Sequence, residues 1–447
     1  MKRLRYKTVL KEGDSSESSS SKFTKNFLII ETPKRLISNY LGFFIVYFIL
    51  SSITIYLTVY LPVYLLSILN VDRTDLAFLQ IFVFSVLFVA PVLGFLFDKF
   101  DHYKKEILLF SFFLFLFSFI ATVFSSEILY FFGLFLALNL LSNEIIKVGM
   151  SKILLDSAIN EKIKDRNLTI INVSANFGGF IPSLVFMFIV TDIYNLNLWT
   201  YFFLIGGISI IPILSAMYFF DFKDILHEKN MQQKINNNSS KNNYYQILLL
   251  TLSFILVWSD KLYQYPFPSW ILSKYGQTGL MLYSFSYIFF LLLNALGCII
   301  GQKLPKYFIK NKKKKKNIVN LDFKNSESLD DSMKNIRKKI IIISNVLYIF
   351  LTFLMAFSNL VYLLLIYGLI CFIAGIMMLN YVSLSISISK KVKYQTFSYQ
   401  MLRLGLAIAS VIFIPVGTFL SSFLPTELLI LIVGFLSIFS LIPLLFL

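Results

Sequence analysis

The sequence predicts an all-α membrane protein whose twelve transmembrane helices form two pseudo-symmetric six-helix bundles. Three observations lead to this prediction. The composition is too apolar for a soluble protein: 57% of the 447 residues are hydrophobic and 15% are charged, against about 25% charged in soluble domains. Long charge-free runs recur along the chain, and most lysines and arginines fall between alternate runs. Because the runs are continuously apolar, they favour helices over barrel strands, which alternate apolar and polar residues.

The charge-free runs mark the candidate membrane spans in order, because a charged side chain is costly in hydrocarbon. A spanning helix needs about 20 residues. The run 340–389 holds 50 residues, so we divide it at Ser358-Asn359. The run 128–143 is short, so the fourth span must continue through Glu144 and Lys147. Eleven runs therefore give twelve spans; the runs are 36–71, 76–97, 107–126, 128–143, 167–191, 193–220, 242–259, 275–302, 340–389, 404–426 and 428–447.

The distribution of basic residues predicts the orientation in the membrane. Of the 41 lysines and arginines, 37 lie in the N-terminal tail and the even-numbered loops, whereas three lie in the odd-numbered loops. Because positively charged loops stay in the cytosol, we expect both termini there. The same bias explains the net charge of +17 without a nucleic-acid partner. We expect the protein in the cell membrane, with an organelle membrane as the alternative.

Polar segments predict how the chain is divided. We expect a disordered cytosolic tail over 1–38, a six-helix bundle over 39–220, a linker over 221–243 and a second bundle over 244–447. The second bundle contains a Lys-rich cytosolic loop, 303–339, with an unbroken lysine run from Lys312 to Lys316. Such a run beside a bilayer attracts anionic headgroups. An anionic-lipid site and a simple topology anchor are the two interpretations.

The few cysteines and histidines exclude several function classes. Cys298 and Cys371 lie in apolar runs, and His102 and His227 lie in charged segments. These residues cannot build a disulfide framework or a zinc cluster, so we expect no metal and no cofactor. The chain lacks the glycine-rich phosphate loop of ATP-driven pumps. It also lacks histidines or paired catalytic carboxylates within the spans, so we do not expect an enzyme.

The second span ends in a motif that combines glycine with charges, Gly94-Phe-Leu-Phe-Asp98-Lys99-Phe-Asp-His-Tyr-Lys104-Lys105. Gly94 lets two helices approach closely, and Asp98 can cap a neighbouring helix and pair with a cation. The lysines are expected at the cytosolic interface. The motif resembles the signature between helices 2 and 3 of the major facilitator superfamily. This resemblance implies a twelve-helix transporter fold with a conformational lock at this motif.

The next cytosolic loop and the fifth span add to the resemblance. The loop ends in Arg166, and Asn176-Phe-Gly178-Gly179-Phe-Ile-Pro182 follows. They are similar to the acidic–basic loop and the Gly/Pro-rich helix 5 of many facilitators. The resemblance implies that Arg166 pairs with Asp98. The alternative is that Arg166 is one more positive charge on the cytosolic side.

The second half repeats these landmarks weakly. Gly297 and Gly301 end the eighth span, where the signature should recur, but Gly301 stands in the place of the aspartate. We therefore expect the N-terminal half to carry the lock. Phe180-Ile-Pro182 recurs as Phe413-Ile-Pro415, so two halves of six spans fit an internal duplication.

Polar residues at helical spacing on the first, fourth, seventh and eighth spans are candidates for a substrate pathway. The alternative for each is a hydrogen bond between neighbouring membrane helices. The candidates are Tyr47, Ser51, Thr54, Thr58, Asn139, Asn143, Trp258, Tyr283, Tyr287 and Asn294.

Two ionisable residues stand inside the fourth span. Glu144 and Lys147 are three positions apart and can pair across one helical turn. An ionisable residue within a span suggests a function by default, and many facilitators carry a coupling-linked basic residue on helix 4. We therefore take Glu144 and Lys147 as candidates for proton coupling. The alternative is that both side chains snorkel to the cytosolic interface.

These features predict a secondary transporter that moves a small organic solute by alternating access, in which the two halves expose a midplane site to one side at a time. The few charges and many tyrosines favour a neutral, amphipathic or aromatic solute over a multiply charged one. We expect a monomer whose partners are the solute and the lipid bilayer. The alternative is a facilitator-fold receptor or scaffold that no longer transports, which the degenerate second signature permits.

Overall fold

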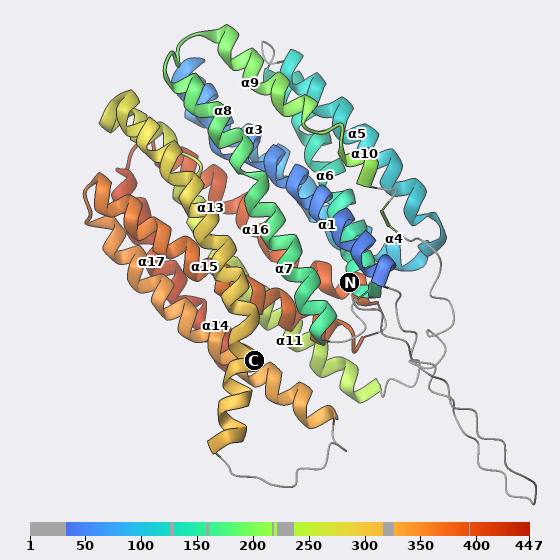
Figure 1. Cartoon of the computed structure of the whole chain (residues 1–447). Coiled ribbons are helices and arrows are strands. Elements are labelled where there is room, and N and C mark those ends of the chain that lie inside the picture. The colour runs from blue at the N-terminus through green and yellow to red at the C-terminus, as the bar shows by residue number, and fades with distance from the viewer. Residues whose placement is uncertain are drawn as a thin grey trace, which may run out of the picture.

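The computed structural model describes residues 33–125, 129–157, 161–216, 219–220, 237–315, 326–392 and 394–447. Within these ranges the chain is helical and contains no strand (Figure 1). The helices up to residue 216 are α1 Pro33–Ile55, α2 Leu61–Val63, α3 Arg73–Ser85, α4 Ala90–Lys99, α5 Lys104–Phe124, α6 Leu129–Ser157, α7 Glu161–Gly178, α8 Phe180–Val190, α9 Leu196–Ile208 and α10 Ile213–Ala216. The later helices are α11 Asn237–Val257, α12 Lys261–Gln264, α13 Phe267–Lys315, α14 Ser326–Ala356, α15 Leu360–Ser389, α16 Gln395–Leu420, α17 Thr426–Phe439 and α18 Leu441–Phe446. Short π or 3-10 turns occupy Tyr56–Tyr60, Tyr64–Ile68, Val86–Val89, Asp101–Tyr103 and Trp258–Asp260.

The described residues contain eleven segments that are long and apolar enough to cross a membrane. One of them, Asn243–Ile309, holds 67 residues, which is roughly 100 Å of helix for a hydrocarbon core of about 30 Å. Gly276 interrupts it with a non-helical backbone (φ 67°, ψ −167°). At that length the segment has room for two crossings, which the prediction of twelve spans requires of it; the described residues themselves give eleven candidate spans. The fourth span is the continuous helix α6, which runs through Glu144 and Lys147 as predicted.

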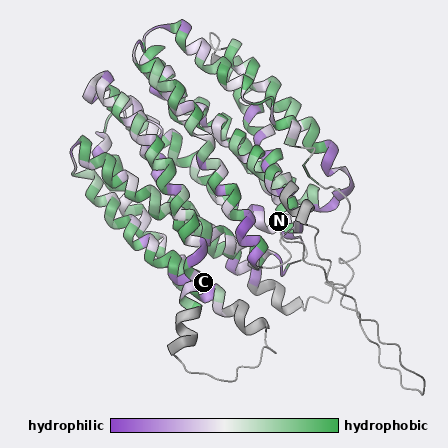
Figure 2. Ribbon diagram, in the orientation of Figure 1, coloured by the Kyte–Doolittle hydropathy of each residue, from purple (hydrophilic) through white to green (hydrophobic). Residues whose placement is uncertain are grey.

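The outer surface of the bundle is apolar. Figure 2 shows hydrophobic residues along most of the helix length, with hydrophilic residues concentrated near the helix ends. Large aromatic side chains point outward, among them Phe110, Phe188 and Phe357, with 66%, 76% and 80% of their surface exposed. In water such a surface would be unfavourable, whereas in a bilayer it contacts lipid. This surface confirms the prediction of an integral membrane protein.

Two long helix interfaces make most of the contact between the first half of the chain and the second. Helix α16 packs along α3 and α4, and α13 packs along α7 and α8. Helix α16 forms the eleventh span, and α3 and α4 form the second; α13 belongs to the eighth span, and α7 and α8 to the fifth. In both interfaces, therefore, the fifth span of one half packs against the second span of the other half. Gly94 permits the close approach of α4 and α16, since a Cβ there would lie 3.1 Å from the backbone nitrogen of Phe397.

Each half starts and finishes at the same end of the bundle. A Cβ at Gly42, near the start of the apolar segment that begins at Asn39, would touch the ring of Phe220, which follows the sixth span. Leu444 in α18 belongs to the same buried cluster as Ile247, near the start of the apolar segment that begins at Asn243. An even number of crossings in each half explains both contacts. We call this end, where α4 and α15 finish and α16 begins, the predicted cytosolic end.

Several predicted features lie outside the described residues. They include most of the N-terminal tail 1–38, most of the linker 221–243, and the side chains of the run from Lys312 to Lys316. The disordered tail, the linker and the anionic-lipid site therefore stay predictions.

Candidate functional site

A cluster of three charged side chains lies in the middle of the bundle. Glu144 stands near the midpoint of α6, and Nη2 of Arg403 on α16 lies 2.9 and 2.8 Å from its two carboxylate oxygens. Lys147, one turn along α6, lies 3.4 Å from the same carboxylate. Glu144, Lys147 and Arg403 are called the central cluster below. The cluster links the first half of the chain to the second, because α6 and α16 belong to different halves.

Glu144 does not reach the membrane interface. Its side chain is only 7% exposed and its charge is paired within the protein, which argues against snorkelling for this residue. The side chains of Lys147 and Arg403 are 24% and 18% exposed. The two cations therefore keep part of their surface accessible, whereas the carboxylate is enclosed.

Arg403 is the member of the cluster that the sequence analysis missed. It was counted as a charge of the cytosolic loop between the tenth and eleventh spans, because the charge-free run begins at residue 404. The structure starts α16 at Gln395, so Arg403 lies within the helix. An acid within the fourth span is the signal that could have pointed to a basic partner on another helix, in addition to Lys147 on its own helix.

Polar side chains surround the central cluster. The Oε1 of Gln400 accepts a hydrogen bond of 3.4 Å from Nη1 of Arg403. The Nε2 of Gln400 and the Oδ1 of Asn143 are buried without a hydrogen-bond partner among the described residues. Tyr47 on α1 lies within electrostatic reach of Glu144 and Arg403. Of the predicted pathway residues, Tyr47 lies near the charged residues, and Asn139 and Asn143 on α6 each have a buried Oδ1 without a hydrogen-bond partner among the described residues.

Asp98 forms a second contact between the halves, at the predicted cytosolic end. Its Oδ2 accepts hydrogen bonds from the backbone nitrogens of Thr396 and Phe397, at 3.0 and 3.2 Å, and so caps the first turn of α16. Its Oδ1 lies 3.4 Å from Nζ of Lys152 on α6. Asp98 therefore makes the two kinds of contact expected from its chemistry, a helix cap and an ion pair.

The expected pair of Asp98 with Arg166 is not formed. Arg166 is exposed on α7, and its guanidinium lies 4.3 Å from the ring centre of Tyr40. Lys152 takes the place next to Asp98 because the last turns of α6 run beside α4. The pairing implied by the family resemblance is therefore wrong in this structure.

The lysines of the motif lie at the predicted cytosolic end and are exposed or half-buried. Lys99 is exposed and lies 5.5 Å from the ring centre of Phe100. Lys104 pairs with Asp101 at 3.5 Å, and Lys105 is exposed. Pairs of this kind at a protein surface contribute little to stability.

Asp165 forms a third contact between the halves, also at the predicted cytosolic end. Asp165 on α7 is fully buried and accepts a 2.7 Å hydrogen bond from Arg337 on α14, which is 1% exposed. The Oγ of Ser383 on α15 donates to the same oxygen at 3.2 Å, and Lys306 on α13 lies 3.4 Å from the other. The expectation that only the N-terminal half carries the lock is therefore incomplete, because the second interface has its own buried acid.

In this third contact the acid lies on α7 in the first half of the chain, and not at the position of Gly301 in the second half. Gly301, where the signature would place an aspartate, packs against α15, and its carbonyl accepts a hydrogen bond from Asn380. Asp165 on the fifth span provides the charge instead. Arg337 had been counted as a loop charge, although it lies in the helix of the ninth span.

Several pathway candidates instead join neighbouring helices. Asn139 donates to the carbonyl of Phe115 and to Ser118, which ties α6 to α5. Asn294 accepts from Asn176 on α7 and donates to the carbonyl of Cys371 on α15, each at 3.0 Å. For Asn139 and Asn294 the interpretation as contacts between helices is therefore the one that the structure favours.

The hydroxyl groups on α1 and the following π-helical turn are satisfied locally. Thr54 and Thr58 donate to the carbonyls of Leu50 and Thr54, at 2.7 and 2.8 Å. Ser51 is half-buried on the same helix. The two threonine hydroxyls therefore already have acceptors within their own helical segment.

The aromatic candidates fall into two groups. Tyr283 and Tyr287 pack edge-on or tilted in an aromatic cluster with Phe267 and Phe290. Trp258 lies directly after α11, and its ring centre is 4.9 Å from Nζ of Lys261. Neither group contacts the central cluster through any hydrogen bond of the described residues.

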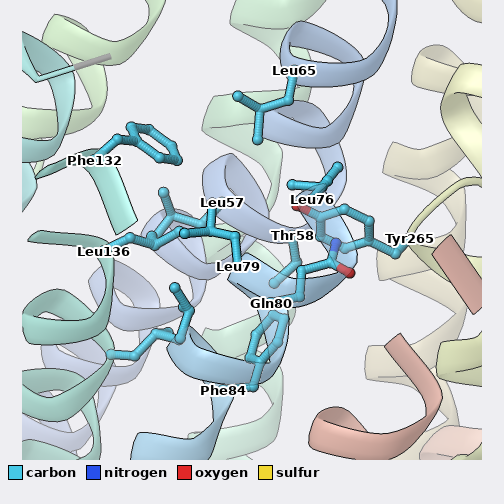
Figure 3. A pocket seen from close by; sticks show the side chains of 12 residues that line it. Leu57, Thr58, Leu65, Leu76, Leu79, Gln80, Phe84, Phe132, Leu136 and Tyr265 are labelled. Atoms are coloured by element: carbon cyan, nitrogen blue, oxygen red, sulfur yellow. The ribbon is translucent and has the colours of Figure 1, made fainter. Parts of the chain in front are cut away.

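A small apolar pocket lies between the first, second and fourth spans (Figure 3). Leucines make up half of the lining residues, Thr58 and Gln80 are polar, and Tyr265 enters from the second half. Its volume of about 20 Å³ suffices for a water molecule and not for an organic solute. At the same end of the bundle, Arg73 hydrogen-bonds Ser421 at the end of α16.

Solved transporter structures share this fold. The nucleoside transporter NupG is 12% identical, with a TM-score of 0.56 over 92% of this chain and 98% of that one. The human organic anion transporter MFSD10 (TETRAN) is 13% identical, with a TM-score of 0.61 over 93% and 100%. A bacterial homologue of the iron transporter ferroportin, in an outward-facing state, is 13% identical, with a TM-score of 0.60 over 92% and 98%. At these identities the similarity shows the fold alone.

The sequence itself gives the family. No curated protein sequence matches the chain. Residues 11–316 match the family model described as Major Facilitator Superfamily, which is more than half of the 447 residues. The motif at Gly94–Lys105, the helical architecture and the solved transporters agree with that match. The chain belongs to the Major Facilitator Superfamily.

Proposed function

We propose that the chain is a secondary transporter that moves a small organic solute across the membrane by alternating access. Residues 39–220 and 244–447 are the two moving halves, and both termini face the cytosol. The chain's family and its fold support a membrane transporter; the solute and the mechanism are the proposed part.

The observation that carries the proposal is that a few discrete polar contacts join the halves. Glu144 pairs with Arg403 in the middle of the bundle. Asp98 caps α16, and Asp165 pairs with Arg337, at the predicted cytosolic end. Hydrogen-bonded ion pairs between packed helices have discrete made and broken arrangements, which suits a two-state rocking motion. The described conformation is then the one held shut at the cytosolic end.

The receptor or scaffold alternative loses its main support. It depended on the missing aspartate at Gly301, which left the second interface without a lock. Asp165 supplies a buried acid at that interface, so a polar contact between the halves is retained on both sides. A protein that no longer moved would not need such contacts.

Uptake by reconstituted protein tests the proposal. Proteoliposomes should take up a panel of labelled metabolites faster than empty vesicles. A reversible thiol cross-link between Phe95→Cys and Tyr394→Cys, whose parent rings lie 5.3 Å apart, should stop uptake, and reduction should restore it. Each single-cysteine variant treated with the same reagent is the control. Uptake equal to that of empty vesicles, or uptake that continues when the halves are linked, would exclude alternating access.

A further inference from the structure

The central cluster has more positive charge than negative. Glu144 contributes one negative charge, and Lys147 and Arg403 contribute two positive charges. The charges that act most strongly on Lys147 are those of Glu144 and Arg403. A net charge in the middle of a membrane bundle is costly, so a site of this kind is expected to be neutralised by an ion or a ligand during its working cycle.

The hydrogen-bond donors of the cluster also outnumber the acceptors. An arginine has five N–H donors and a lysine has three, whereas a carboxylate has two oxygens. Both carboxylate oxygens of Glu144 accept short hydrogen bonds from Nη2 of Arg403. The remaining contacts are long, at 3.4 Å from Lys147 to Glu144 and 3.4 Å from Nη1 of Arg403 to Gln400. Both cations keep part of their surface accessible, so they can accept a further anionic partner without first losing Glu144.

A buried amide provides an independent sign of a missing acceptor. Gln400 is fully buried beside Arg403, and its Nε2 has no hydrogen-bond partner among the described residues. A buried donor without an acceptor is unfavourable by about 1–3 kcal/mol. Gln400 lies one turn from Arg403 on α16, so its free donor belongs to the same face as the guanidinium.

We propose that Lys147 and Arg403 bind the carboxylate of a small monoanionic organic solute. One negative charge neutralises the cluster, whereas a dianion would leave a net negative charge in a low-dielectric site. Tyr47 and Tyr399, which lie within electrostatic reach of Arg403, provide aromatic surface and hydroxyl groups for the remainder of the solute. The inference rests on the proposed transport function and narrows the sequence-based expectation of a neutral, amphipathic or aromatic solute to a monoanionic one.

Matched acids and amides test this proposal on the purified full-length protein. The probes are benzoate and benzamide, nicotinate and nicotinamide, and lactate and lactamide, each titrated while thermal unfolding is followed. A ligand that binds the folded protein raises its unfolding temperature by mass action. At least one carboxylate should stabilise the protein while its amide does not. The proposal is wrong if no carboxylate stabilises the protein or if the amide of each active pair is equally effective.

Two variants distinguish binding by the cluster from a structural role. Lys147→Gln keeps the Glu144–Arg403 pair and should weaken carboxylate binding roughly 10- to 100-fold, the value of one charged hydrogen bond. Lys339→Gln, at an exposed lysine, is the matched control and should bind normally. Glu144→Gln adds a net positive charge and should bind the carboxylate at least as tightly. Undiminished binding by Lys147→Gln would overturn the proposal even if Glu144→Gln fails to fold.

The transport assay separates this inference from the proposed function. If proteoliposomes take up no solute although carboxylates bind, the transporter proposal fails and the binding site stands. If proteoliposomes take up solutes without discriminating acids from amides, transport stands and the monoanion site is wrong.

Discussion

Arg403 and Glu144 lie 259 positions apart in the sequence, yet the guanidinium contacts both carboxylate oxygens at less than 3 Å. The pair is the only charged hydrogen bond that joins α6 to α16 in the described part of the chain. It connects the two halves where a transported solute would have to pass. Its energetics and its opening should therefore influence both stability and transport.

Removal of either member of the pair should destabilise the protein. Arg403→Gln leaves Glu144 enclosed with only Lys147 beside it, and breaking a buried pair typically costs about 3–5 kcal/mol. Because Arg403 is partly exposed, we expect a loss of stability near the lower end of this range, about 3 kcal/mol. Thermal unfolding in detergent can be followed with a thiol-reactive dye, because Cys298 and Cys371 are both free and Cys298 is buried.

The double variant Glu144→Gln/Arg403→Gln makes this test specific. Because the two side chains contact each other directly, the double loss should be smaller than the sum of the single losses by roughly 1–3 kcal/mol. Additive losses would mean that the ion pair contributes no coupling between α6 and α16.

The cap on α16 should hold the predicted cytosolic end closed. Asp98→Asn removes the negative charge of the carboxylate that accepts hydrogen bonds from the backbone nitrogens of Thr396 and Phe397 and pairs with the ammonium of Lys152. We expect faster labelling of a cysteine at Ser398, which is buried one turn into α16, by an impermeant maleimide in a background without native cysteines. Glu106→Gln, at an exposed acid of the same end, is the control. Unchanged labelling would mean that Asp98 does not act as a lock.

Lys152 and Arg166 give a direct comparison of the observed pairing with the expected one. Lys152→Gln should increase the labelling of the same cysteine, because its side chain lies 3.4 Å from Asp98. Arg166→Gln should leave labelling unchanged, because that guanidinium packs on Tyr40. A large effect of Arg166→Gln with none of Lys152→Gln would restore the pairing implied by the family resemblance.

The third contact offers two variants with very different expected costs. Asp165→Asn removes the charged acceptor of the 2.7 Å hydrogen bond from the buried Arg337, so we expect a loss of about 3–5 kcal/mol in stability. Lys306→Gln removes a lysine whose side chain is 46% exposed, and the expected loss is below about 1 kcal/mol. Thermal unfolding of both variants checks the difference. Equal losses would contradict the role of Arg337 as the main partner of Asp165.

The sequence allows the contacts of Asp98 to be predicted from one short motif. It does not allow the contacts of Arg403 and Arg337 to be predicted, because their partners are distant in the sequence. The cap by Asp98 could be anticipated, because an aspartate at a helix end has few favourable partners besides backbone N–H groups and cations. Arg403 and Arg337 could not be placed, because a charge-free run ends at the first charge even when the helix continues. Each arginine is tolerated within its helix by an acid on a helix of the other half, Glu144 or Asp165.

The close approach of α4 and α16 should depend on Gly94. In Gly94→Ala the new Cβ would lie about 3.0–3.1 Å from Gln400 and from the backbone of Phe397, so the helices must separate slightly. Overpacking of this kind costs typically 1–3 kcal/mol. Gly207→Ala is the control, because its Cβ would meet Phe119 at an ordinary 3.5 Å. Equal unfolding temperatures for the two variants would show that the contact can adjust freely.

Glu144 should link proton movement to transport. Protonation of Glu144 would remove the charge that holds Arg403 and would weaken the contact between the halves, with Lys147, Tyr47 and Tyr399 as the other titratable groups nearby. In Glu144→Gln this step is permanently bypassed, so an imposed pH gradient should no longer drive uptake. Exchange of internal for external solute needs no net proton movement and should continue. The measurement is uptake by proteoliposomes with and without the gradient, beside counterflow in the same vesicles. If the gradient still drives uptake in Glu144→Gln, proton coupling must reside on another group, and the carboxylate serves only to position Arg403.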